Sequence, residues 1–167
     1  QAQGLEVGAS LVEEDKVHSA ADTLRKAEGQ DITLVLPQDV VVAEEFAANA
    51  PNRTVPVNRI PDGWYIMDIG PLTIRSFQRG IQECRTVLWN GPMGVFEYEP
   101  FAFGTIAVAT TLARLERAVT VIGGGSTAEA VERLGLAARM THVSTGGGAS
   151  LELLEGRPLP GVVALLD

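Results

Sequence analysis

The sequence predicts an α/β domain of doubly wound, Rossmann-like type, in which a mostly parallel sheet carries helices on both faces. Three observations lead to this prediction. Short apolar runs alternate with helical patterns, glycine-rich turns follow those runs, and 46% of the 167 residues are hydrophobic. Right-handed crossovers between such units place helices over both faces of a parallel sheet. The length suits one domain or part of a larger one.

A helix is expected near the start of the chain. Ser10 and Glu13 have the spacing of a capping box, and apolar residues then recur at helical intervals up to residue 29, a glycine. Two β-branched runs follow, residues 32–36 and 40–42, which resemble buried strands. Residues 51–61 contain three prolines and are expected to be a surface connection.

Four strand-to-helix units make up the rest of the chain. Each begins with a short apolar run and continues through a turn containing glycine into a helical pattern. The expected strands are residues 65–69, 86–89, 119–122 and 142–144. Because the carboxyl ends of parallel strands meet at one edge of a sheet, the glycine-rich turns are expected there, where such sheets bind ligands.

Charge and composition exclude several classes of function. The formal net charge is −8, so no broad cationic face is expected for nucleic acid or an anionic membrane. No apolar stretch approaches the roughly 20 residues that a membrane helix needs. Cys84 is the one cysteine, so no disulfide forms within the chain. A cytoplasmic protein is expected.

The turns themselves indicate an anionic ligand. Glycines between a strand and a helix let the backbone approach a ligand, and the helix N-terminus favours a phosphate. The alternative is that such turns serve only tight packing. Two glycine triplets, 123–125 and 146–148, at one sheet edge favour a nucleotide or phosphate ligand. No Walker A run exists, and Gly123, Gly125 and Ala128 match a dinucleotide fingerprint that lacks its later acidic residue.

Glu97 follows the turn after the expected strand at 86–89 and has the chemistry to accept two ribose hydroxyls. Spacing alone favours the other interpretation, a solvated carboxylate or a cap of the helix that Pro100 opens. No serine nucleophile elbow, zincin helix or convincing metal cluster supports hydrolase chemistry.

At these turns the sequence strongly resembles the phosphoglycerate kinase family. The resemblance lies in the motifs LWNGPMGVFE (88–97), GGGSTA (123–128) and HVSTGGGASLE (142–152), and it extends along the chain through DIGP (68–71) and LPGV (159–162). It implies that residues 1–167 are the C-terminal portion of that family's nucleotide-binding domain, an incomplete domain without the N-terminal substrate lobe.

The resemblance also implies roles for individual residues. Three glycines face the transferring phosphoryl group as the catalytic loop: Gly146, Gly147 and Gly148. By this resemblance, Glu97 holds the ribose hydroxyls, and Asn90 and Pro92 line the nucleotide. The phosphates face Gly124, Gly125 and Thr127. Ser126 stands where the family most often has an aspartate that binds Mg²⁺, and Ile66 stands where the family usually has a glycine on the adenine side.

The activity implied is reversible phosphoryl transfer from 1,3-bisphosphoglycerate to MgADP, giving 3-phosphoglycerate and MgATP in glycolysis. The family's enzyme is a two-lobed monomer whose substrate lobe and first nucleotide loop supply cations. The two lysines of this chain, Lys16 and Lys26, both precede the glycine-rich turns by far, so the chain alone is expected to be inactive. The alternative is a noncatalytic nucleotide- or phosphate-binding α/β module.

Overall fold

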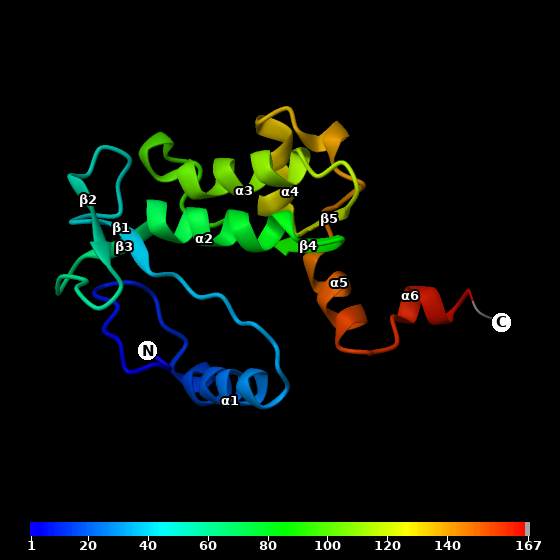
Figure 1. The fold of residues 1–167 in the computed structure, drawn as a ribbon, viewed down its shortest axis with the longest axis horizontal. Coiled ribbons are helices and arrows are strands. Elements are labelled where there is room, and N and C mark those ends of the chain that lie inside the picture. The colour runs from blue at the N-terminus through cyan, green and yellow to red at the C-terminus, as the bar shows by residue number, and fades with distance from the viewer. Residues whose placement is uncertain (166–167) are drawn as a thin grey trace. The chain divides into compact units, whose positions relative to one another are not determined.

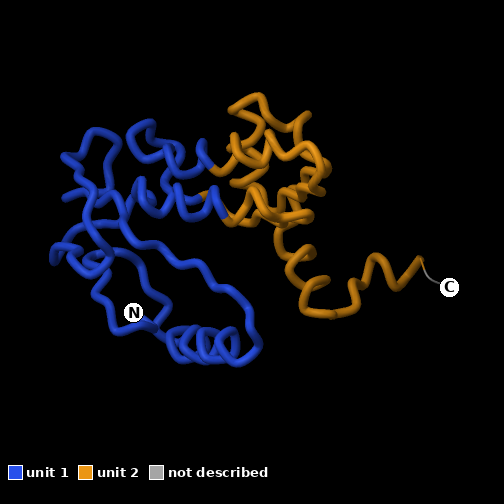
Figure 2. The backbone as a smooth tube through the Cα atoms, viewed as in Figure 1, with its two compact units in different colours: residues 1–79, 93–107 blue, residues 80–92, 108–167 orange. Residues whose placement is uncertain are grey.

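The computed structural model describes residues 1–165, which form two compact units (Figures 1 and 2). The first unit comprises residues 1–79 and 93–107, and the second comprises residues 80–92 and the chain from 108 onward. From residue 65 onward, strands and helices alternate along the chain and include a parallel sheet, so the predicted α/β class is confirmed. Within the described residues, no helix is both long and apolar enough to cross a membrane.

The first unit is built on a three-stranded antiparallel sheet. Strand β1 (Asp39–Ala43) lies between β2 (Asn52–Pro56) and β3 (Tyr65–Ile69). Two predictions are therefore wrong: the stretch 51–61 contains a strand, and β3 does not belong to the parallel sheet. The single buried residue of β2 is Val55, and one apolar position among polar ones is a weak strand signal.

The expected helix near the start is present, but its cap is not. A short 3-10 turn, η1 (Glu14–Lys16), leads into α1 (Val17–Gly29), and no side chain caps either element. The Ser10 hydroxyl instead accepts the backbone N–H of Ile66 at 2.8 Å. The capping-box prediction is wrong because Ser10 is bonded to β3, far away in sequence.

The predicted strand at residues 32–36 is also wrong. The segment joins α1 to β1 as an extended connection (Figure 1), and all five of its side chains are exposed. It pairs with none of the strands among the described residues. A β-branched run becomes a strand only where a neighbour bonds its backbone N–H and C=O groups. The run at 40–42 has two such neighbours and forms the middle of β1.

The two helices predicted after the strands at 65–69 and 86–89 are present. Helix α2 (Pro71–Gln82) comes directly after β3, and η2 (Glu99–Phe101) precedes α3 (Phe103–Ala113). One apolar cluster of the first unit joins Met67 of β3 to Phe101, which is fully buried, with Val95 and Tyr98 packed against it. The segment between β4 and α3 is therefore held on the antiparallel sheet.

The second unit contains the predicted parallel sheet, in the order β4 (Thr86–Asn90), β5 (Val119–Gly123) and β6 (His142–Ser144). Helix α4 (Gly125–Arg133) follows β5, and α5 (Gly147–Leu154) follows β6. The short elements η3 (Ala137–Arg139) and α6 (Pro160–Val163) complete the unit. The three strands and the helices α4 and α5 match their sequence predictions, whereas η3 and α6 were not predicted.

Candidate functional site

The carboxyl ends of the three parallel strands are in register. Asn90 at the end of β4 pairs with Gly123 at the end of β5, and Gly123 pairs with Ser144 at the end of β6. The three turns that follow therefore start at one edge of the sheet, as the sequence predicts. This is the edge at which open parallel sheets bind ligands.

The turns approach one another so closely that only glycine fits. A Cβ on Gly147 would lie 2.9 Å from the Gly124 Cα and 3.3 Å from the Asn90 Oδ1. Gly124 has a φ of +93°, and a Cβ there would lie 2.8 Å from the same Asn90 oxygen. Both positions need glycine, the first for space and the second also for its backbone conformation. The structure thus brings together three of the predicted site residues.

Thr127 connects two of these turns through a hydrogen bond. Its side chain is buried, and its hydroxyl accepts the N–H of Gly91 at 2.8 Å. The turn after β4, which also carries the half-buried Pro92, is thereby fixed to the first turn of α4. The Thr127 hydroxyl still has its own proton to donate.

The helices that follow two of the turns begin without a side-chain cap. Gly124 is the N-cap of α4 and Gly146 is the N-cap of α5, and neither helix has a side chain bonded to its first amides. Gly125, Ser126 and Gly148 in these first turns are exposed. Uncapped amides and the helix dipole make both N-termini suited to an anion.

Glu97 belongs to the first unit, on the segment between Met93 and α3. Its side chain is exposed. The interpretation of Glu97 as a helix cap is not supported, because Tyr98 is the N-cap of η2 and no side chain caps that element. Glu97 remains either a solvated carboxylate or a ligand contact.

Two buried aspartates of the first unit were not singled out by the sequence. Burial raises the pKa of Asp39, but hydrogen bonds from Leu72 and Thr73 and the charge of Arg75 outweigh this and hold the pKa below its usual value. Burial raises the pKa of Asp68 to about 6, although backbone amides donate hydrogen bonds to it. An acidic residue inside an otherwise apolar strand is the sequence signal that would have identified Asp68.

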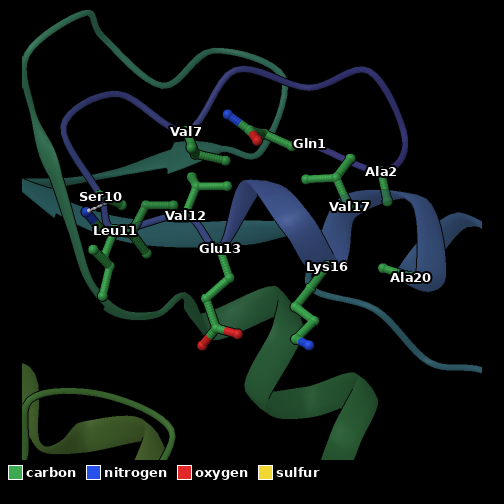
Figure 3. Close-up of a pocket in the computed structure, with 11 residues that line it drawn as sticks. Gln1, Ala2, Val7, Ser10, Leu11, Val12, Glu13, Lys16, Val17 and Ala20 are labelled. Atoms are coloured by element: carbon green, nitrogen blue, oxygen red, sulfur yellow. Dashed lines mark hydrogen bonds between the residues drawn. The ribbon is translucent and has the colours of Figure 1, made fainter.

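A largely apolar cavity of about 500 Å³ lies in the first unit, between the start of the chain and α1 (Figure 3). Figure 3 shows the side chains of Glu13 and Lys16 extending away from Val7, Val12 and Val17. Ile66, at the position that the family resemblance puts on the adenine side, lines this cavity. Its backbone N–H donates to the Ser10 hydroxyl. None of the other predicted site residues lines it.

The described residues contain no group of three or more His, Cys, Asp or Glu side chains placed to hold a metal ion. Ser126 presents a neutral hydroxyl at the positive end of α4, which favours an anion over a cation. The residues present fit a phosphate better than a resident metal ion.

Comparison with known proteins gives consistent results. The model of the phosphoglycerate kinase family matches residues 1–157. The chain is similar to the phosphoglycerate kinase of Synechococcus elongatus, with 56% identity over 169 residues, 100% of this chain and 42% of that protein. It is similar to the cytosolic phosphoglycerate kinase of Nicotiana tabacum, also with 56% identity over 169 residues and 42% of that protein.

Solved structures with the same names are similar as well. The phosphoglycerate kinase of Coxiella burnetii superposes with a TM-score of 0.91 at 38% identity, over 97% of this chain and 42% of that one. The enzyme of Pyrococcus horikoshii gives a TM-score of 0.73 at 32% identity, over 98% of this chain and 41% of that one. The chain thus spans about 42% of the length of these relatives.

Proposed function

Since this chain belongs to the phosphoglycerate kinase family, we propose that it is the C-terminal portion of that enzyme's nucleotide-binding domain. The whole enzyme would transfer a phosphoryl group reversibly between 1,3-bisphosphoglycerate and MgADP, giving 3-phosphoglycerate and MgATP. The substrate lobe would lie in the part of the relatives' length that this chain does not span. The protein would be a cytoplasmic monomer that binds neither nucleic acid nor membranes.

The observation that supports this proposal best is the meeting of three turns at the edge of the parallel sheet. Gly147 approaches Gly124 and Asn90 too closely for any side chain, and the helices behind the turns have uncapped N-termini. Such an arrangement offers backbone N–H groups to a polyphosphate without any lysine. The nucleotide contacts proposed in this unit are Asn90, Pro92, Gly124, Gly125, Ser126 and Thr127.

In the first unit, Glu97 is proposed to accept the two ribose hydroxyls. A carboxylate beside polyphosphate would repel it, whereas vicinal hydroxyls donate two charge-assisted hydrogen bonds. The exposure of Glu97 leaves its carboxylate open to a ligand. Its role is therefore proposed for ribose and not for phosphate.

The loop of Gly146, Gly147 and Gly148 is proposed to stabilise negative charge on the transferring phosphoryl group through the amides of Gly147 and Gly148, because the Gly146 N–H already donates to the Ser144 hydroxyl at 3.1 Å. Preorganised backbone donors stabilise a charged transition state because they need no reorganisation during the reaction. Magnesium would enter as part of the nucleotide substrate, held mainly by phosphate oxygens and water, with Ser126 as the one neutral side-chain oxygen beside it. The 167-residue chain alone is expected to show no turnover, because phosphoryl transfer also needs cations and positioning.

Calorimetric titration of the 167-residue chain tests this proposal. MgADP should bind more tightly than pyrophosphate, and Glu97→Gln should weaken ADP by about tenfold while leaving pyrophosphate unchanged, because a hydrogen bond to a charged group is lost. Glu99→Gln, an exposed carboxylate two residues away, is the matched control and should change neither affinity. Equal losses for both ligands in Glu97→Gln would make Glu97 a structural carboxylate and contradict the ribose assignment.

A further inference from the structure

Asp68 is a fully buried carboxylate that the proposed function does not use. It lies on β3 with only 1% of its surface exposed. Its Oδ2 accepts the N–H of Gly104 at 2.8 Å, and its Oδ1 accepts the N–H of Ile69 at 2.8 Å. The backbone amide of Phe103 donates a further hydrogen bond. The carboxylate therefore occupies the N-terminus of α3.

The same carboxylate also contacts the segment 93–104 at its other end. A Cβ placed on Gly94 or on Gly104 would fall on the carboxyl group of Asp68. Both glycines are therefore needed for the close approach of the backbone to this side chain. Asp68 is thus hydrogen-bonded to the end of the segment that carries Glu97 and lies in close contact with its beginning at Gly94.

The residue before Asp68 holds the middle of that segment. The N–H of Val95 donates to the carbonyl oxygen of Met67 at 2.9 Å, and the N–H of Tyr98 donates to the carbonyl oxygen of Val95 at 3.0 Å. Glu97 lies between these two anchored amides. The Met67 side chain packs with Phe101 in a buried apolar cluster. Few degrees of freedom are left to the backbone at Glu97.

We propose that Asp68 is a positioning residue for nucleotide recognition: its carboxylate binds the amides at the end of the segment 93–104, packs against its beginning, and thereby sets where the Glu97 carboxylate meets the ribose. This inference rests on the proposed function, because it assigns Asp68 an effect through Glu97. An apolar side chain would fill the same space but would leave the amides of Phe103 and Gly104 without an acceptor. A buried acceptor with fixed geometry orients the segment, which packing alone does less sharply.

A double-mutant cycle on the 167-residue chain tests the inference. The ligands are ADP and pyrophosphate, and the variants are Asp68→Asn, Glu97→Gln and the two combined, each titrated by calorimetry. Asp68→Asn should weaken ADP by about tenfold and leave pyrophosphate unchanged. If Asp68 acts through Glu97, the double variant should bind ADP no more weakly than Glu97→Gln alone.

Asp39→Asn is the matched control. Asp39 is also buried and also holds the N-terminus of a helix, through the amides of Leu72 and Thr73 at 3.0 and 2.8 Å. It has no contact with the segment 93–104 among the hydrogen bonds of the described residues. At equal folded fraction it should bind ADP like the unmodified chain. A loss of ADP affinity in Asp39→Asn as large as in Asp68→Asn would overturn the inference, because any buried helix cap would then suffice.

The remaining outcomes are equally decisive. If Glu97→Gln leaves ADP binding unchanged, the proposed ribose contact fails and the inference fails with it. If Glu97→Gln weakens ADP and Asp68→Asn does not, or if the two losses add, the ribose contact stands and the positioning role is wrong. This separates failure of the inference from failure of the proposed function.

A milder variant keeps the inference testable if Asp68→Asn does not fold. The buried Thr105 hydroxyl accepts the N–H of Met93 at 3.1 Å at the start of the same segment. Thr105→Val removes that acceptor and leaves the carboxylate in place. ADP should weaken by about threefold, in keeping with the loss of one neutral hydrogen bond, with pyrophosphate unchanged. An unchanged ADP affinity would show that anchoring of the segment does not govern Glu97 and would overturn the inference.

Discussion

The two units of this molecule begin their helices in opposite ways. In the first unit, buried carboxylates occupy the helix N-termini: Asp39 accepts two amides of α2, and Asp68 accepts amides at the start of α3. In the second unit, glycines stand at the N-caps of α4 and α5, and no side chain is bonded to their first amides. The N-termini of α2 and α3 are thus filled, in that side-chain carboxylates of the chain accept their amides. The N-termini of α4 and α5 are open, in that no side chain among the described residues accepts the amides of their first turns.

The difference separates scaffold from binding site. An N-terminus that already holds a buried carboxylate has its free amides satisfied, so it serves folding and offers nothing to a ligand. An N-terminus with only glycine before it keeps its amides and its dipole for an external anion. We therefore propose that phosphate binds at the turns of the second unit and that the aspartates of the first unit serve stability and positioning.

The largest effect is expected from removing a filled N-terminus. Asp39→Ala leaves the amides of Leu72 and Thr73 without their acceptor, whereas the Thr73 hydroxyl keeps the backbone carbonyl of residue 39, so the free energy of unfolding should fall by about 3 kcal/mol at pH 7. Urea unfolding followed by circular dichroism measures it. Asp62→Ala, an exposed aspartate, is the control and should cost little. A loss below about 0.5 kcal/mol would mean that water replaces the cap.

The two aspartates should have opposite pH dependences. The pKa of Asp39 is lowered on folding, so the stability it contributes is present above the unfolded value of 3.8 and is lost as pH falls further. The pKa of Asp68 is raised from 3.8 to about 6. The contribution of Asp68 is therefore greatest below pH 4 and falls by about 3 kcal/mol at most as pH rises to 6.

Unfolding measurements of Asp39→Asn and Asp68→Asn between pH 3 and pH 7 check this difference. Asp68→Asn should lose more stability relative to the unmodified chain at pH 4.5 than at pH 7. The loss in Asp39→Asn should be nearly the same at these two pH values and should shrink only below pH 3.8. Profiles with the same slope for both variants would mean that the environments of the two carboxylates do not differ as described.

Gly147 and Gly148, at the start of α5, should respond differently to the addition of a Cβ. Gly147→Ala places a Cβ 2.9 Å from the Gly124 Cα, whereas a Cβ on Gly148 meets no atom within 4 Å. Because backbone atoms must move, Gly147→Ala should weaken pyrophosphate and ADP by about tenfold, and Gly148→Ala should leave both affinities nearly unchanged. Calorimetry on both variants measures this. Equal affinities for the two variants would show that close contact of the turns is not needed for binding.

The smallest effect is expected at Ser126. Ser126→Asp adds a negative charge to the first turn of α4, so pyrophosphate without Mg²⁺ should bind about twofold more weakly, while MgADP should bind about twofold more tightly. Ser126→Asn, which stays neutral, is the control. Titrations with and without Mg²⁺ compare the two variants. An unchanged Mg²⁺ dependence in Ser126→Asp would mean that Ser126 does not lie beside the metal.

Elements that depend on a local sequence pattern were predicted correctly, whereas features that depend on contacts between residues far apart in the sequence were missed. The strands β4, β5 and β6 and the turns after them follow from short apolar runs that end in glycine, and all three are present. Residues 32–36 have the same local pattern but pair with no strand among the described residues. Ser10 fits a capping box locally, yet its hydroxyl bonds Ile66, 56 residues away.

The residues of the candidate site also differ in how far the sequence alone could identify them. Asn90, Gly124 and Gly147 could be chosen from their places after strands, and the structure brings them together. Asp68 could be noticed as a charge inside an apolar strand, but its role could not be predicted, because its partner Gly104 lies 36 residues further along the chain. Local sequence identifies turns, whereas the function of a buried charge depends on which amides the fold brings to it.

Titration of isotope-labelled chain with pyrophosphate, followed through backbone amide chemical shifts, tests the central contrast most directly. We predict saturable shifts at the amides of Gly125 and Ser126 in α4 and at the turn before α5, with no saturable shift at Thr73 and Gly104, whose amides are bonded to aspartates. Saturable shifts at Thr73 and Gly104 with none at Gly125 and Ser126 would contradict it, because the filled N-termini would then be the ones that bind the anion.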